Sequence, residues 1–155
     1  MNDNKILLLG LGLLFLSIKN SKAISNFVTP VDGKITSAFG ERSNPLTGGK
    51  DFHNGIDIAA PVGTNVHAPL SGQVAKIYSN EVGGLQMILK HPNDIYTGYA
   101  HLSQTIAKPL QYISAGDIIA KTGQSGEVTG PHLHFTVFNS KGTFLNPTDF
   151  INIPI

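Results

Sequence analysis

Cysteine is absent from the 155 residues, and charged side chains make up only 14% of them. Without cysteine the chain can form neither a disulfide nor a thiolate zinc site, so any metal has to be held by histidine and carboxylate. The shortage of charge leaves few of the Glu and Lys residues that cover surface helices. The formal net charge is only +1, which excludes the basic footprint of a nucleic-acid-binding protein.

Turn-forming residues are abundant instead, with 17 glycines and 9 prolines. Gly, Pro and Asn interrupt short apolar segments roughly every ten residues, a spacing typical of an antiparallel sandwich or open barrel. The length suits one domain, so we predict a single all-β domain built from antiparallel sheets. The predicted strands are Lys34–Phe39, Asn65–Ala68, Gln73–Tyr78, Leu85–Lys90, Ile95–His101, Asp117–Thr122 and His132–Phe138. Helical turns are expected only near Ser103–Ala107 and Thr148–Ile151.

The N-terminal 23 residues differ from the rest of the chain. Residues 6–18 form an apolar run that predicts a hydrophobic helix, at the upper length of a signal-peptide core but shorter than a typical membrane span. Ser21 and Ala23 form a small-x-small cleavage site, which places Ile24 first in a mature domain of residues 24–155. Lysines that follow the run favour a membrane anchor instead. Residues 1–23 are therefore either a signal peptide or a short membrane anchor.

Two histidines lie two residues apart in the segment Gly130–Phe138. Apolar residues occupy alternate positions there, which predicts a half-buried strand. His132 and His134 then share one face, about 6.6 Å apart along the strand. Imidazole is both the commonest metal ligand and the readiest acid–base group near neutral pH, so this pair indicates a metal site or a catalytic site.

A second histidine segment combines His53 and Asp57 around Asn54-Gly55. In a straight strand the two side chains would lie about 13 Å apart, too far to meet at one ion. Asn-Gly favours a tight turn or a bulge, which would let His53 and Asp57 converge. The alternative is that Asn-Gly is only a hairpin turn and Asp57 a solvated carboxylate. No comparable motif surrounds His67 or His91, and we expect both to be structural.

Together these segments resemble the lysostaphin-type zinc endopeptidases, which cut peptidoglycan cross-links. The resemblance covers nearly all of residues 29–150. It is carried by His53-x-x-x-Asp57, Tyr99-Ala100-His101-Leu102-Ser103, His132-x-His134, Ala38-Phe39-Gly40-Glu41-Arg42-x-Asn44-Pro45-x-x-Gly48, Gly55-Ile56-Asp57-Ile58-Ala59-Ala60-Pro61-x-Gly63-Thr64, Ala115-Gly116-Asp117 and Asn146-Pro147. It implies that residues 24–155 form a zinc endopeptidase domain with an active-site groove. His53, Asp57 and His134 would be the Zn²⁺ ligands, and His101 and His132 the two histidines that do not bind the metal.

The implied chemistry agrees with these residue types. Three protein ligands leave a fourth zinc position for the water that attacks the scissile carbonyl. The chain has no His-Glu-x-x-His motif, so the base is not the usual glutamate. His101 and His132 are expected to share the roles of acid–base and oxyanion stabiliser, and the sequence does not say which takes which. Tyr99 belongs either to the pocket or to the core. Thr136 and Thr97-Gly98 depart from many relatives, where we expect only a change in groove shape or rate.

Two functions remain in competition. The first is a peptidoglycan hydrolase that acts on stem-peptide cross-links, and the second is a catalytically inactive module that binds wall peptide or regulates another hydrolase. All five site residues are present, which favours the enzyme. The apolar leader predicts export to the periplasm or cell envelope, with residues 6–18 as the candidate membrane contact. A virion-associated peptidase fits the same sequence, and the oligomeric state is left open.

Overall fold

The computed structural model describes residues 27–44 and 46–153. Twelve strands and one 3-10 turn make up the regular structure of these residues. The elements in chain order are β1 (Lys34–Ser37), β2 (Gly40–Ser43), β3 (Lys50–His53), β4 (Ile56–Ala59), β5 (Asn65–His67), β6 (Gly72–Asn80), β7 (Gly84–His91), β8 (Ile95–Thr105), β9 (Tyr112–Ile113), β10 (Ile118–Thr122), β11 (His132–Phe138), β12 (Phe144–Leu145) and η1 (Pro147–Asp149). The predicted all-β fold is confirmed.

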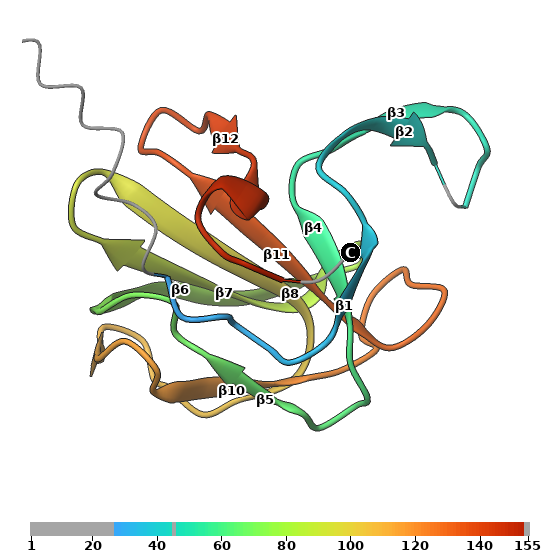
Figure 1. Ribbon diagram of the computed structural model, residues 1–155. Helices are drawn as coiled ribbons and strands as arrows, with labels where there is room; N and C mark the ends of the chain where they lie inside the picture. The colour runs from blue at the N-terminus through green and yellow to red at the C-terminus, as the bar shows by residue number, and fades with distance from the viewer. Residues whose placement is uncertain (1–26, 45, 154–155) are drawn as a thin grey trace, which may run out of the picture.

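The main sheet has the strand order β1-β4-β11-β8-β7-β6-β9, and every pairing in it is antiparallel. β5 and β10 pair with each other and lie below this surface in Figure 1, joined to it by the pairing of β10 with β8. β2 and β3 form a separate hairpin that projects from the main sheet. The predicted sandwich or open barrel is thus realised as one sheet that folds over itself.

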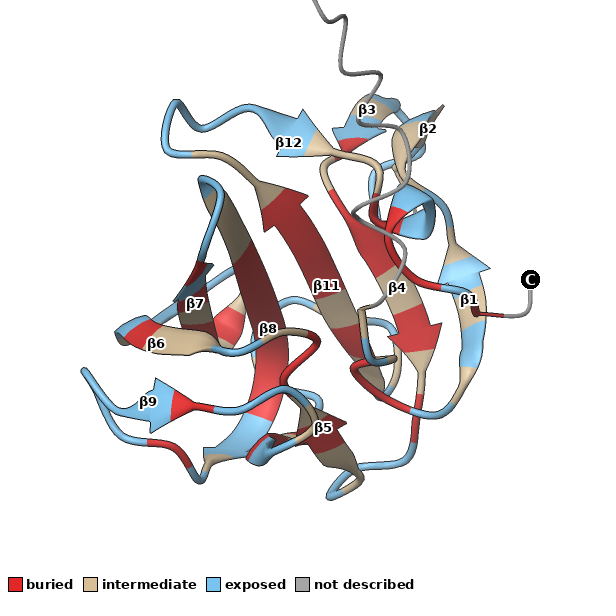
Figure 2. Cartoon of the chain, turned by 60° about the vertical axis from the view of Figure 1, so that its left-hand side comes forward, coloured by how far each residue is buried: buried red, intermediate tan, exposed pale blue. Residues whose placement is uncertain are grey.

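Alternating burial along β4 and the first half of β11 shows which face of the sheet is the core. Ile56 and Ile58 on β4 and Leu133 and Phe135 on β11 are fully buried, while the residues between them are only partly buried. Figure 2 shows these buried positions as bands along β4, β11 and β8. Each such side chain contributes ~1.5–3 kcal/mol by its burial. Shifting the pairing of these strands by one residue would expose all four apolar side chains. Their burial therefore fixes the strand register, and with it the positions of the side chains on the opposite face.

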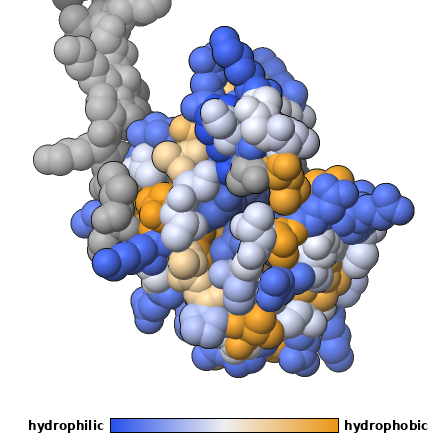
Figure 3. All heavy atoms as spheres, turned by 90° about the vertical axis from the view of Figure 1, so that its right-hand side faces the viewer, coloured by the Kyte–Doolittle hydropathy of each residue, from blue (hydrophilic) through white to orange (hydrophobic). Residues whose placement is uncertain are grey.

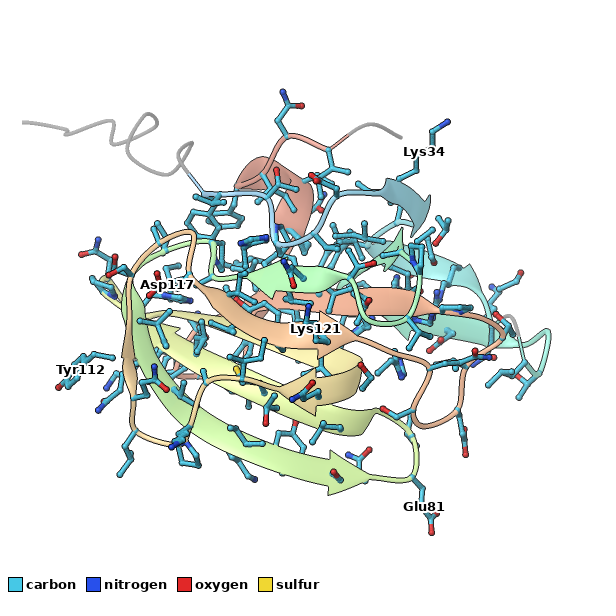
Figure 4. All side chains as sticks on the ribbon, turned by 90° about the horizontal axis from the view of Figure 1, so that it is seen from below. Lys34, Glu81, Tyr112, Asp117 and Lys121 are labelled. Carbon is cyan, nitrogen blue, oxygen red and sulfur yellow. The ribbon has the colours of Figure 1, made fainter. Side chains whose placement is uncertain are left out.

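The outer surface mixes polar side chains with exposed apolar ones such as Leu46, Val62 and Leu110. Lys34, Glu81 and Tyr112 extend outward from different parts of the molecule (Figure 4), and Tyr112 is 80% exposed.

The long strand β8 pairs with β11 through its first half and with β10 through its second half. It continues to Thr105, so the helical turn predicted near Ser103–Ala107 is wrong. Ser103 is held there because its hydroxyl donates to the carbonyl of Thr122. The turn predicted near Thr148–Ile151 is present as η1.

The predicted N-terminal hydrophobic helix over residues 6–18, and the boundary after residue 23, lie outside the described residues. In the part of the chain that the structure describes, no helix has the length and apolarity needed to cross a membrane.

Candidate metal centre

Two site residues come from neighbouring strands at the same register position. His134 on β11 pairs directly with Asp57 on β4. Both side chains lie on the face opposite the buried Ile56, Ile58, Leu133 and Phe135. His134 Nδ1 lies 2.8 Å from Asp57 Oδ1. His132 Nε2 also lies 3.7 Å from Asp57 Oδ1, so the shared face that the sequence predicts for His132 and His134 is confirmed, and it lies beside the Asp57 carboxylate of β4.

His53 reaches the same point by a sharp turn between β3 and β4. β3 ends at His53 and β4 begins at Ile56, so Asn54 and Gly55 reverse the chain. His53 Nε2 then lies 3.2 Å from Asp57 Oδ1 and 3.1 Å from His134 Nδ1. A Cβ at Gly55 would lie 2.4 Å from the carbonyl oxygen of Phe135, so only glycine fits this turn. The predicted convergence of His53 and Asp57 is confirmed, and the alternative of a solvated Asp57 is wrong.

Hydrogen bonds on the far side of each ring determine which nitrogens face the centre. His53 Nδ1 donates to the carbonyl of Ala38 at 2.8 Å, and His134 Nε2 donates to the Asn54 side-chain oxygen at 3.1 Å. With these protons directed outward, His53 Nε2 and His134 Nδ1 are the ring nitrogens that face each other and the Asp57 carboxylate. These two nitrogens and the carboxylate are the groups that a metal ion between them would bind.

The donor set fits a divalent metal ion. His53, Asp57 and His134 each offer one ligand atom, and these atoms all lie within 4.8 Å of one another. Two neutral imidazoles and a carboxylate are the ligands expected of a catalytic zinc site that keeps one position open. Burial acts to raise the pKa of the Asp57 carboxyl, but hydrogen bonds and charge interactions with His134 and His53 outweigh it and hold this pKa far below its usual range. The carboxylate therefore stays ionised, as metal binding requires.

The two histidines predicted not to bind the metal lie beside this group. His132 is on the same face of β11, with its Nε2 3.7 Å from Asp57 Oδ1. The ring of His101 lies 4.7 Å from the ring of His132 and 6.1 Å from that of His134, measured between centroids. The Nδ1 atoms donate to backbone carbonyls, that of His132 to Gly130 and that of His101 to Ser125. Each Nε2 is left able to accept or donate a proton at the centre.

His101 occupies an irregular point of β8. Between the pairs Leu85–Leu102 and Met87–Tyr99 the register shifts, so that Ala100 and His101 stand opposite the single residue Gln86. His101 has a positive φ of 62°, a backbone conformation that is uncommon outside glycine. Bulges of this kind are frequent beside active sites because they re-aim a side chain. Burial lowers the pKa of His101 most, and the nearby His132 and His134 lower it further, against the opposing effects of Ser125 and Asp57. The ring is thus neutral near pH 7.

All five predicted residues line one open groove of about 410 Å³. Its walls are the β2–β3 hairpin, the β6–β7 turn and the loop between β10 and β11, contributed by residues such as Phe52, Val82 and Val128. Figure 3 shows the face from which the hairpin projects, where apolar side chains lie beside hydrophilic ones.

Three neighbours of the site were not predicted, although two lie in motifs that the sequence displays. The sequence marks Asn54 only as a turn former, yet its side chain also orients His134. Arg42 lies 3.5 Å from Asp57 Oδ2, and Ser125 holds His101. For Ser125 the sequence carries no signal, because its role depends on a loop that returns to β8 from a distant part of the chain.

The remaining candidates are structural. Tyr99 is 2% exposed and its hydroxyl bonds Thr97, so it belongs to the core and not to the pocket. His67 donates to the carbonyl of Gly116, and His91 is buried and bonded to Ser71 and Thr97. Both lie away from the five-residue centre, as expected.

Comparison with known proteins gives consistent matches. The profile described as peptidase family M23 matches residues 51–147. Peptidoglycan DD-endopeptidase ShyB of Vibrio cholerae is 38% identical over 112 residues, which are 70% of this chain and 26% of that protein. The chain spans about a quarter of the length of the first curated relatives it matches.

Solved structures share the fold. A zinc-containing peptidase from Vibrio cholerae superposes with a TM-score of 0.73 at 32% identity, over 86% of this chain and 41% of that one. The catalytic domain of the antimicrobial peptidase lysostaphin from Staphylococcus simulans gives a TM-score of 0.69 at 32% identity, over 76% of this chain and 91% of that one.

Proposed function

Because the chain belongs to peptidase family M23, we propose that it is a zinc-dependent endopeptidase that hydrolyses the stem-peptide cross-links of bacterial peptidoglycan. The observation that carries this proposal is the convergence of His53, Asp57 and His134 with two further histidines in one open groove. Relatives such as ShyB are named peptidoglycan DD-endopeptidases, which supports direct stem-peptide cross-links as the substrate class.

In this proposal His53 Nε2, Asp57 Oδ1 and His134 Nδ1 hold the zinc ion. When bound, the ion activates water and polarises the scissile carbonyl. The chain itself supplies the orientation of its ligands, because the Ala38 carbonyl and the Asn54 amide fix the two imidazole tautomers. Such outer partners preserve the geometry of ligands through each turnover.

His101 and His132 handle protons in this proposal. A neutral imidazole whose Nδ1 is tied to a carbonyl can accept a proton at Nε2 and then donate it from the same atom. The lowered pKa of His101 makes it the better candidate for the base, since it is neutral at the working pH. His132, closer to the Asp57 carboxylate, is then the candidate for stabilising the oxyanion.

The first experiment is digestion of purified peptidoglycan by the purified chain, with mass spectrometry of the released fragments. We expect peptide cross-links to be cut, the activity to be lost with a chelator and to return with zinc. His101→Ala should bind zinc with parental affinity and cut at least ~100-fold more slowly, the usual share of general acid–base catalysis. Parental cleavage by His101→Ala would remove this residue from the mechanism.

The competing function is a wall-binding or regulatory module without activity. It would bind wall material yet release no fragment from any wall type, even with zinc at the centre. The presence of all five site residues in one groove favours the enzyme. We further propose that the chain works in the cell envelope, with residues 1–23 as export signal or membrane anchor. A virion-associated peptidase would use the same chemistry.

A further inference from the structure

The two oxygens of the Asp57 carboxylate have different surroundings. Oδ1 faces the imidazoles, at 2.8 Å from His134 Nδ1, 3.2 Å from His53 Nε2 and 3.7 Å from His132 Nε2. Oδ2 faces Arg42, whose Nη1 lies 3.5 Å away. One oxygen is thus available to a metal, while the other is held by a fixed positive charge.

Arg42 stands on the projecting hairpin and makes two further polar contacts. It stands on β2 directly opposite Asp51 on β3, and its Nε lies 3.7 Å from Asp51 Oδ2. Its Nη1 also donates to the Ser37 hydroxyl on β1. The side chain is 24% exposed, and Nε is buried without a hydrogen-bond partner among the described residues. The guanidinium therefore joins β1, β3 and β4 beside the metal centre.

We propose that Arg42 is a positioning residue that keeps Asp57 a one-oxygen metal ligand. This inference rests on the proposed zinc site. A free carboxylate can bind a metal through both oxygens and so occupy two coordination positions. By attracting Oδ2, Arg42 leaves only Oδ1 for the ion and preserves the open position that catalysis needs. Arginine suits this task because its guanidinium stays charged at every working pH and presents several fixed donors.

The proposal predicts a loss of metal affinity and a change of coordination when Arg42 is replaced. Arg42→Met keeps the aliphatic bulk and removes the donors. We expect its zinc affinity, measured by competition with a chromophoric chelator, to fall ~10–100-fold, as for other outer-shell partners of metal ligands. After cobalt substitution, its visible absorption should weaken toward that of a higher coordination number, because Asp57 can then bind through both oxygens.

The matched control is Asp51→Asn, which removes the other ion-pair partner of Arg42 and leaves the Arg42–Asp57 contact in place. We expect this variant to keep parental zinc affinity and the parental cobalt spectrum. If Asp51→Asn lost as much affinity as Arg42→Met, Arg42 would only hold the hairpin and the proposal would be overturned. Parental affinity and spectrum in Arg42→Met would overturn it equally.

If Arg42→Met does not fold, a second variant tests the same proposal. Arg42→Lys keeps the charge but offers a single ammonium group, which cannot contact Ser37, Asp51 and Asp57 together. We expect at least a threefold loss of zinc affinity, and parental affinity would refute the proposal. These readouts need no wall substrate. A parent chain that binds zinc here and cuts no cross-link would refute the proposed function but leave the role of Arg42 standing.

Discussion

Four imidazoles at the centre follow one rule: each gives one ring N–H to an oxygen outside the site. The acceptors are the carbonyls of Ala38, Ser125 and Gly130 and the amide oxygen of Asn54. Three of these acceptors are main-chain atoms, so the residue types at those positions carry no signal. The sequence could therefore predict the histidines and Asp57 but not the atoms that orient them.

Asn54 is the one side-chain acceptor of the four, so it can be tested by substitution. Asn54→Ala removes the oxygen that accepts the Nε2 proton of His134. His134 can then adopt the other tautomer, which turns a proton toward the metal. We expect zinc affinity to fall ~10-fold or more, within the range found for outer-shell partners. Unchanged affinity in calorimetric titration would show that the ring is oriented by other contacts.

The buried position of His91 leads to a prediction of how the free energy of unfolding depends on pH. It donates to Ser71 through Nδ1 and accepts from Thr97 through Nε2, while Thr97 accepts from the Tyr99 hydroxyl. Burial lowers the pKa of His91, against a smaller opposing effect of the Ser71 carbonyl. The unfolded chain therefore binds this proton at a higher pH than the folded chain does. Stability is full above the unfolded pKa of about 6.5 and falls as the pH drops below it.

The measurement is urea unfolding at several pH values from 8 to 5, with chelator present so that metal release does not contribute. The parent should lose stability toward pH 5. His91→Gln should be less stable at pH 8 but lose less on acidification, because one of the groups that take up protons on unfolding is gone. Equal pH dependence in parent and variant would contradict this role of His91.

Among the secondary-structure elements, strands with regular apolar alternation can be predicted from the sequence. Strands that lack this alternation cannot. The predicted bounds agree closely with β6, β7 and β11, whereas β8 begins at the predicted Ile95 but continues four residues past the predicted end at His101. The sequence does not predict β2 and β3, which carry few apolar residues, or β4, which follows directly on the Asn54-Gly55 turn signal. The bulge at His101 was not predictable, because it arises from the unequal pairing of β7 and β8. The site depends on that bulge as much as on the histidine.

Ser125 ties this bulge to the loop between β10 and β11. Its carbonyl accepts from His101, while its hydroxyl donates to Leu102 and accepts from Leu85. Ser125→Ala keeps the carbonyl but removes the two hydroxyl bonds, each worth ~1 kcal/mol. We expect kcat to fall several-fold with zinc affinity unchanged.

The matched control is Ser103→Ala, which removes a similar hydroxyl-to-carbonyl bond on β8, that to Thr122. Its stability should fall by a comparable amount while kcat stays near the parental value. If both variants lost kcat equally, the effect would come from general loosening of β8 and not from the anchoring of His101.

For the whole molecule, the resemblance to lysostaphin-type peptidases and the antiparallel fold are confirmed. The family could be predicted because its motifs recur in order over most of the chain, in turns as well as within β8 and β11. The helical turn expected near residues 103–107 was wrong, because pairing with β10 overrides the local preference of that segment. The leader over residues 6–18 and the roles of the five site residues stay predictions.

The proposed activity depends on one zinc ion held by His53, Asp57 and His134. The most direct measurement is anomalous diffraction at the zinc edge from crystals of the purified chain. We expect a single strong peak about 2.0–2.2 Å from His53 Nε2, Asp57 Oδ1 and His134 Nδ1, with His101 and His132 beyond bonding distance. A peak bound by any other set of residues, or none at this centre with zinc in excess, would contradict the account.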